Sequence, residues 1–233
     1  MTLRQEADAI IHAALRAAQP DAAVRRALRA LPDCRGRLLL VAAGKAAWQM
    51  AAAAQAALGG RIADGVVITK YGHARGALDG LRIFEGGHPV PDANCFAATD
   101  AAMALARGAG PEDMVLFLLS GGGSALFEKP LLPPQELASL TSALLACGAD
   151  IVEINTVRKR LSAVKGGRFA QLCAPARVFS VILSDVLGDP PDMIASGPAY
   201  PDSSTSEQAQ AIAEKYAPVS YTHLRAHETR HDL

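Results

Sequence analysis

The chain has 233 residues, of which 50% are hydrophobic and 20% charged, and its 23 basic and 23 acidic residues give a formal net charge of zero. This is enough apolar material for one large domain or two small ones. A balanced charge argues against a nucleic-acid partner. The four cysteines form no CxxC pair, which argues against a zinc site or a redox motif and predicts reduced, mostly buried thiols.

The start of the chain is amphipathic and charged, with no continuous apolar segment of the kind found in signal peptides. The apolar runs elsewhere are too short to span a bilayer. We therefore expect a cytoplasmic protein without a membrane partner.

Helical and strand patterns alternate along the chain. Thr2 followed by Gln5 resembles a capping box that opens a helix, and Pro20 ends that helix. Further helices are predicted over residues 21–31, after Gly44-Lys45 through Ala57, over 93–107, from Pro133-Pro134 to near Gly148, and over 151–163. Strands are predicted at 38–43, 66–69, 81–84, 114–119 and 178–183, the first of them apolar throughout and so covered on both faces. This alternation predicts an α/β fold with a doubly wound, mostly parallel, Rossmann-like sheet and helices on both faces.

The last residues differ in composition from the rest. His223, His227 and His231 have a spacing that would place them on one helical face, as in a metal site. The run SYTHLRAHETRHDL, however, resembles a spurious tail translated from adapter DNA. We therefore expect one domain over 1–217, a non-native disordered tail over 218–233, and no metal site in that tail.

Ligands of doubly wound sheets bind beyond the carboxyl ends of the strands, and unusual residues follow three of the predicted strands. The first such segment is Gly44-Lys45, where a lysine at a helix start would attract an anion. It is not a Walker A loop, because Leu39 stands where that motif needs glycine. An ordinary surface lysine is the alternative.

The second segment is the glycine loop Ser120-Gly121-Gly122-Gly123-Ser124. Three glycines remove every Cβ from the turn, so that backbone amides and two hydroxyls can converge on a phosphate. The loop is not a serine-hydrolase GxSxG elbow, because Leu126 stands at the last position. A flexible turn is the alternative.

The third segment contains Asp185 and Asp189, two carboxylates that suit Mg²⁺ and its phosphate ligands. A solvated acidic turn is the alternative. Ile194-Ala-Ser-Gly-Pro198 follows as a tight turn that could brace this loop.

Two other segments carry polar side chains between these strand ends. Arg158 and Lys165 are expected to share one helical face, where they offer a guanidinium fork and a point charge to an anion. Asn155 precedes them on the same helix. His88, in Gly86-Gly-His-Pro-Val-Pro91, is interpreted as a structural or substrate-positioning residue, since no second ligand lies at metal spacing.

Together these segments resemble the glycerate 2-kinase family. The resemblance extends over residues 1 to about 217 and rests on Gly44-Lys-Ala-Ala47, Gly86-Gly-His-Pro-Val-Pro91, Ser120-Gly-Gly-Gly-Ser-Ala-Leu126, Asn155-Thr-Val-Arg-Lys159, Lys165-Gly-Gly167, Ser184-Asp-Val-Leu-Gly-Asp189, Ile194-Ala-Ser-Gly-Pro198 and Pro201-Asp-Ser-Ser-Thr205. It implies a phosphotransferase that uses ATP and Mg²⁺ to phosphorylate D-glycerate at its 2-hydroxyl. It also implies about twice this length in relatives, so the chain is expected to lack a C-terminal domain and, with it, full activity.

Within that resemblance each segment takes a role. Lys45 and Arg158 would hold the glycerate carboxylate or the transferring phosphoryl group, and the amides of Ser120–Ser124 would hold phosphate. Asp185 or Asp189 would hold Mg²⁺ or accept the hydroxyl proton, and Lys165 would meet developing negative charge.

Two rival functions remain at this stage. Many relatives carry the label hydroxypyruvate reductase, but the chain has no GxGxxG dinucleotide fingerprint. A non-catalytic domain that senses a phosphorylated metabolite is the other. The sequence is compatible with a homo-oligomer and leaves the oligomeric state open.

Overall fold

The structure is a computed structural model that describes residues 2–216. Its described residues form one five-stranded, all-parallel sheet in the order β3-β2-β1-β4-β5. The strands are β1 (Leu38–Ala43), β2 (Ile62–Lys70), β3 (Leu81–Gly86), β4 (Met114–Ser120) and β5 (Arg177–Leu183). This confirms the predicted α/β fold and places β1 at the centre of the sheet, between β2 and β4.

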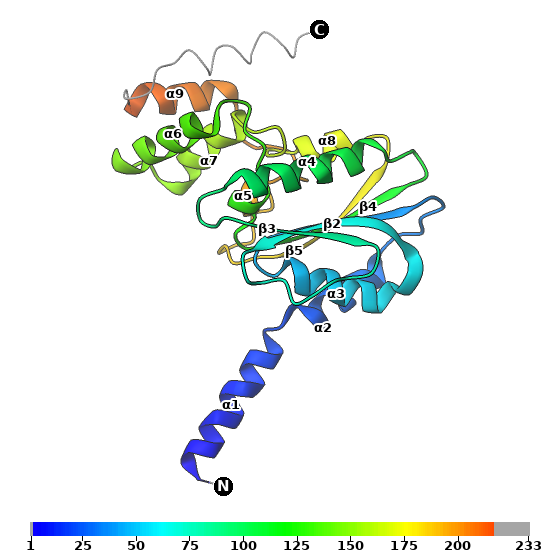
Figure 1. Ribbon diagram of the computed structural model, residues 1–233. Helices are drawn as coiled ribbons and strands as arrows, with labels where there is room; N and C mark the ends of the chain where they lie inside the picture. Colours follow the sequence, from blue (N-terminus) through cyan, green and yellow to red (C-terminus); the bar gives the residue numbers. More distant parts are fainter. Residues whose placement is uncertain (1, 217–233) are drawn as a thin grey trace.

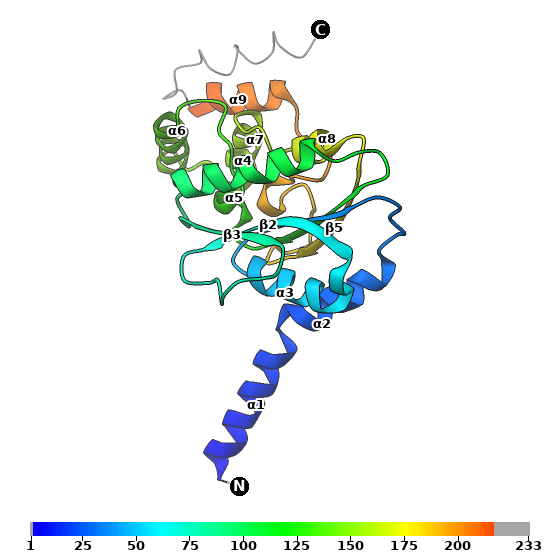
Figure 2. The same cartoon turned by 45° about the vertical axis from the view of Figure 1, so that its right-hand side comes forward.

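Helices cover both faces of the sheet (Figures 1 and 2). On one face lie α2 (Pro20–Ala27) and α3 (Ala47–Leu58), and on the other lie α4 (Ala93–Arg107), α5 (Gly123–Leu126) and α8 (Arg168–Cys173). Short 3-10 turns span Leu28–Ala30, Gly59–Arg61 and Ile194–Ser196.

Strands β1 and β4 are buried along their whole length, and their side chains alternate between two cores. Val41 and Phe117 face the α4 side, whereas Leu40 and Leu116 face the α3 side. Since successive residues of a strand point to opposite faces, a continuous apolar run fills both cores at once.

A third group of helices packs beside the α4 face (Figure 1). It contains α6 (Pro134–Ala146), α7 (Ile151–Arg160) and α9 (Ser206–Tyr216), which bury a small apolar cluster that includes Leu137, Leu144 and Val157. The sequence analysis identified neither α8 nor α9.

The predicted end of α7 at residue 163 is wrong, because the helix ends at Arg160. Beyond it the backbone pairs with a different segment: Ala163 N donates to Lys129 O at 2.8 Å, and Ser162 forms a β-bridge with Pro130. Tertiary pairing therefore replaces the helical hydrogen bonds, and Lys165 does not share a helical face with Arg158.

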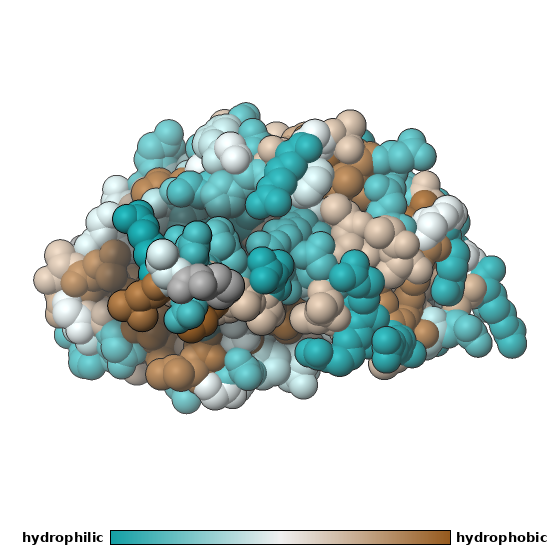
Figure 3. Space-filling model, turned by 90° about the horizontal axis from the view of Figure 1, so that it is seen from below, coloured by the Kyte–Doolittle hydropathy of each residue, from teal (hydrophilic) through white to brown (hydrophobic). Residues whose placement is uncertain are grey.

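The first helix, α1 (Leu3–Ala17), begins with the predicted capping box and projects away from the sheet (Figures 1 and 2). It has no buried residue, and the Leu3 side chain is 84% exposed. Seen from below relative to Figure 1, the surface shows hydrophobic patches among mainly hydrophilic side chains (Figure 3).

Residues 217–233 lie outside the described part, and with them the expected tail and its three histidines. Between residues 2 and 216, no helix is both long enough and apolar enough to cross a membrane. The four cysteines are all free, and Cys95 and Cys173 are buried.

Candidate active site

The carboxyl ends of β1 and β4 are held together closely beneath the glycine loop. Ala46 N donates to Ser120 Oγ at 3.0 Å, and Lys45 N donates to Gly121 O at 2.9 Å. Gly44 has φ +123°, and a Cβ there would lie 2.3 Å from Ser120 Oγ. Only glycine fits this close approach, which fixes Lys45 next to the loop.

Three side chains from other segments lie against the glycine loop. A Cβ at Gly121 would lie 2.2 Å from Asp185 Oδ2, so the Asp185 carboxylate fills the space that a side chain would need. A Cβ at Gly122 would lie 3.0 Å from the His88 ring and 3.1 Å from Lys45 Cγ. The structure thus brings together residues that follow β1, β3, β4 and β5.

The loop presents free backbone donors. Gly122 adopts φ +86° before α5, and the amides of Gly122, Gly123 and Ser124 donate to no acceptor in residues 2–216. Ser124 Oγ lies 3.5 Å from Ser196 Oγ. Successive unpaired amides in such a turn form a concave site that favours an anion.

The charges beside the loop also favour an anion. Lys45 is exposed, and among the described residues its ammonium has no hydrogen-bond or ion-pair partner. Partial burial lowers the pKa of His88, and the nearby cations Lys45 and Lys70 lower it further. His88 is therefore a neutral imidazole at neutral pH, able to donate or accept a hydrogen bond.

Arg158 and Lys165 contact the loop on its carbonyl side, opposite the free amides. Lys165 Nζ is fully buried and donates to Ser124 O at 2.8 Å, while Arg158 Nη2 donates to the same oxygen at 3.1 Å. Both cations also contact the buried carboxylate of Glu128. Lys165 thus supports the loop instead of facing the open site, whereas Arg158 Nε is buried without an acceptor in the described structure.

Asn155 is connected to the loop indirectly. Its Oδ1 accepts a hydrogen bond from Ser196 Oγ at 3.1 Å. Ala195 and Ser196 have φ of 52° and 62°, and a Cβ at Gly123 would lie 2.8 Å from Ala195 Cβ. The tight turn after β5 therefore packs against the glycine loop itself, in backbone conformations that non-glycine residues rarely adopt.

The two acidic candidates differ in position. Asp185 lies over Gly121, whereas Asp189 is exposed, has φ 49°, and is not among the groups beside the loop. No cluster of three or more potential metal-ligating side chains occurs within residues 2–216. The Asp185 carboxylate alone can serve as a protein ligand for Mg²⁺, because this ion keeps several waters and shares oxygens of a phosphate, which the free amides would bind.

Glu128 is not among the residues predicted from the sequence, because it acts through contacts with residues about 30 positions away. Ser196 was expected only as part of the bracing turn Ile194-Ala-Ser-Gly-Pro198. A second buried network, in which Lys159 Nζ donates to Asp202 Oδ1 at 3.0 Å and to Asp192 Oδ2 at 3.4 Å, was also not predicted.

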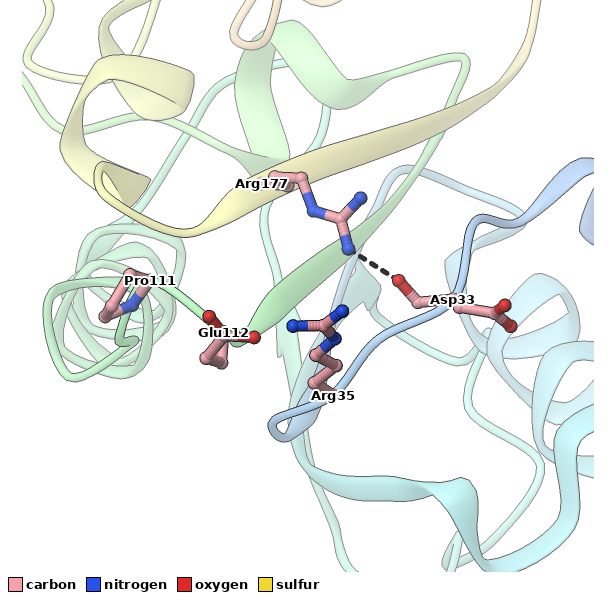
Figure 4. Close-up of a pocket in the computed structure, with 5 residues that line it drawn as sticks. All are labelled: Asp33, Arg35, Pro111, Glu112 and Arg177. Atoms are coloured by element: carbon pink, nitrogen blue, oxygen red, sulfur yellow. Dashed lines mark hydrogen bonds between the residues drawn. The ribbon is translucent and has the colours of Figure 1, made fainter.

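A surface pocket of about 450 Å³ lies at the opposite, amino-terminal end of the strands (Figure 4). It is lined by Asp33, Arg35, Pro111, Glu112 and Arg177, and Arg177 Nη2 donates to Asp33 O at 2.5 Å. Its two guanidinium groups are balanced by two carboxylates, so its charge does not favour an anion.

The fold and the loop define an α/β protein in which free backbone amides, Lys45 and His88 meet at the carboxyl ends of parallel strands. The chain belongs to the family described as a domain of unknown function, DUF4147, whose model matches residues 6–227.

Named relatives agree with the resemblance noted from the sequence. The chain is 54% identical over 217 residues to a D-glycerate 2-kinase of Thermotoga maritima, covering 92% of this chain and 52% of that protein. It is 44% identical over 218 residues to a putative hydroxypyruvate reductase of Agrobacterium vitis, covering 93% and 49%. The crystal structure of a Thermotoga maritima glycerate kinase matches with a TM-score of 0.91 and 51% identity over 98% of this chain and 55% of that one. The chain thus spans about half the length of these relatives.

Proposed function

We propose that the chain carries the anion-binding half of a glycerate 2-kinase, which transfers the γ-phosphoryl group of ATP to the 2-hydroxyl of D-glycerate and gives 2-phosphoglycerate. The observation that supports this most is the meeting of Lys45, His88 and Asp185 at the glycine loop. The name of the Thermotoga relative supports the choice of substrate and of hydroxyl group.

In the proposed reaction the 2-hydroxyl oxygen attacks the γ-phosphorus, the bond from that phosphorus to ADP breaks, and the hydroxyl proton passes to a carboxylate. Asp185 is the favoured acceptor, because it lies at the loop and Asp189 does not. The free amides of Gly122–Ser124 and the Lys45 ammonium hold the charge that spreads over the phosphoryl oxygens.

The remaining candidates have supporting roles. Arg158, whose side chain is 15% exposed, would hold the glycerate carboxylate, and neutral His88 would orient the substrate by a hydrogen bond. Asn155 holds Ser196, and Lys165 holds the carbonyl of Ser124. If Asp185 instead holds Mg²⁺, the ion would neutralise charge on the ATP phosphates, and the hydroxyl proton would pass to Asp189.

We further propose that residues 1–217 form the N-terminal domain and that the other half of the longer relatives completes the cleft. The relatives' greater length supports this proposal. Sequencing the genomic DNA beyond codon 217 tests it: continuation into a second α/β domain is expected, whereas a stop codon after Leu233 would contradict it.

The activity is tested with purified chain, ATP, Mg²⁺ and D-glycerate, following glycerate-dependent ADP release and identifying the product by phosphorus NMR. We expect 2-phosphoglycerate, formed slowly if the cleft is incomplete. If there is no turnover, binding of 2-phosphoglycerate to the chain would still support the proposal. A chain that binds neither substrate nor product refutes it.

The reductase is the second candidate, because the Agrobacterium relative carries that name. It predicts NADH oxidation by hydroxypyruvate in the absence of ATP. That result would overturn the kinase assignment. A sensing domain would instead bind 2-phosphoglycerate without any turnover in the completed protein, and Lys45→Ala would lower only its affinity.

A further inference from the structure

The glycine loop leads into α5, a helix of only four residues, Gly123–Leu126. A single helical turn is not stable by itself, because its formation fixes several backbone dihedrals for very few hydrogen bonds. The orientation of the free amides at Gly122–Ser124 must therefore be maintained by contacts outside the turn.

Two cations supply these contacts at the carbonyl side of the turn. The ammonium of Lys165 has three N–H donors and three acceptors: Ser124 O at 2.8 Å, Phe127 O at 3.3 Å and Glu128 Oε2 at 3.4 Å. Arg158 Nη2 adds a second donor to Ser124 O. Since the carbonyls of a helical turn point away from its amides, fixing Ser124 O inward directs the amides toward the open end of the loop.

One fully buried cation, Lys165, and one partly buried cation, Arg158, meet at the same carbonyl and require a counter-charge, which Glu128 supplies. Its side chain is fully buried, and Oε2 lies 3.3 Å from Arg158 Nη2. Its other oxygen accepts from Ser162 Oγ at 2.5 Å, and its backbone N donates to Thr99 Oγ1 at 3.2 Å. The carboxylate is thus fixed from α7 and the segment after α7, and the Glu128 backbone is fixed from α4.

We propose that Glu128 is a positioning residue for the anion site: it holds Arg158 and Lys165 on the Ser124 carbonyl and so sets the direction of the loop amides. Its effect on ligand binding rests on the proposed function, but its effect on loop geometry does not.

Glu128→Gln tests this, because it removes the charge and keeps the shape. In amide NMR spectra of the free chain we expect shifted signals for Gly122, Gly123 and Ser124, and a roughly tenfold or greater loss of affinity for inorganic phosphate. Asp113→Asn is the matched control, since Asp113 is a buried carboxylate that neutralises Arg37 at the amino-terminal ends of the strands, opposite the loop. It should destabilise the chain without moving the loop signals.

Ser162→Ala is the milder variant, because it removes one hydrogen bond to Glu128 and leaves all charges in place. It should shift the same loop signals in a chain that remains folded, even if Glu128→Gln does not fold. Unchanged loop signals in a folded variant would overturn the proposal. If the wild-type chain does not bind phosphate, the proposed function is in doubt. The spectra of the free chain would still show whether Glu128 sets the geometry of the loop.

Discussion

At the scale of single residues, the site depends on glycines, whose lack of a side chain lets neighbouring groups approach the backbone. Gly44 allows β1 to approach Ser120, and Gly121 leaves room for the Asp185 carboxylate. Three glycines in a row predict a loop open to an anion, and this much could be inferred from the sequence alone. The sequence alone could not show which side chains pack against the glycines, because Lys45, His88 and Asp185 follow three separate strands.

Replacing Gly121 with alanine tests this packing directly. The new Cβ would collide with Asp185 Oδ2, so the carboxylate or the loop must move. We expect affinity for 2-phosphoglycerate to fall by about tenfold or more, since such overpacking typically costs about 1–3 kcal/mol. Isothermal titration calorimetry measures the change.

Gly60→Ala is the control for that variant. A Cβ at Gly60 meets nothing within 4 Å, and this glycine does not have a positive φ. Its affinity should equal that of the wild type, and equal affinities for both variants would show that the space at Gly121 is irrelevant to binding.

His88 gives a prediction for pH. Its pKa is lowered in the folded chain by burial and then by Lys45, Lys70 and His73. As pH falls through about 6.5, the unfolded chain gains this proton first, so stability is lost with acidification. His88→Gln should therefore lose less thermal stability than wild type between pH 7 and pH 5, as measured by calorimetry. Parallel curves for the two proteins would contradict the lowered pKa.

At the scale of elements, the positions of strands and long helices can be predicted from the spacing of apolar residues. The prediction is wrong where tertiary contacts determine the end of an element. The predicted strands at 38–43 and 114–119 match β1 and β4 closely, because both are buried on two faces. The end of α7 was misplaced because Ala163 bonds to Lys129, a partner that local sequence does not reveal. The charged residues show the same limit of sequence-based prediction. Arg158 and Lys165 were predicted as site residues, but their partner Glu128 was not.

Two capping boxes allow a comparison of packed and unpacked helices. Asp150 caps α7, whose Glu153 also accepts from Tyr216 of α9, whereas Thr2 caps the unpacked α1. Asp150→Ala should lower the free energy of unfolding by about 1 kcal/mol, as loss of an N-cap usually does. Thr2→Ala should leave the global transition unchanged, because α1 has no buried residues. Equal effects in urea denaturation would show that α1 unfolds together with the sheet.

At the scale of the whole molecule, the two ends of the sheet have different chemistry. The carboxyl ends carry free amides, Lys45 and neutral His88, whereas the amino ends carry the charge-balanced pocket around Arg35 and Arg177 (Figure 4). Ligands of doubly wound sheets bind at the carboxyl ends. The pocket around Arg35 and Arg177 is therefore not the expected binding site, because its charges are balanced and the free amide donors lie at the other end of the sheet.

The most direct test of this account is a titration of isotope-labelled chain with 2-phosphoglycerate, followed by amide NMR. We predict that the signals of Lys45, His88 and Gly121–Ser124 move together with one dissociation constant, while those of Arg35 and Arg177 stay in place. Shifts centred on Arg35 and Arg177, or no shifts at a saturating concentration of 2-phosphoglycerate, would contradict the assignment of the glycine loop as the anion site.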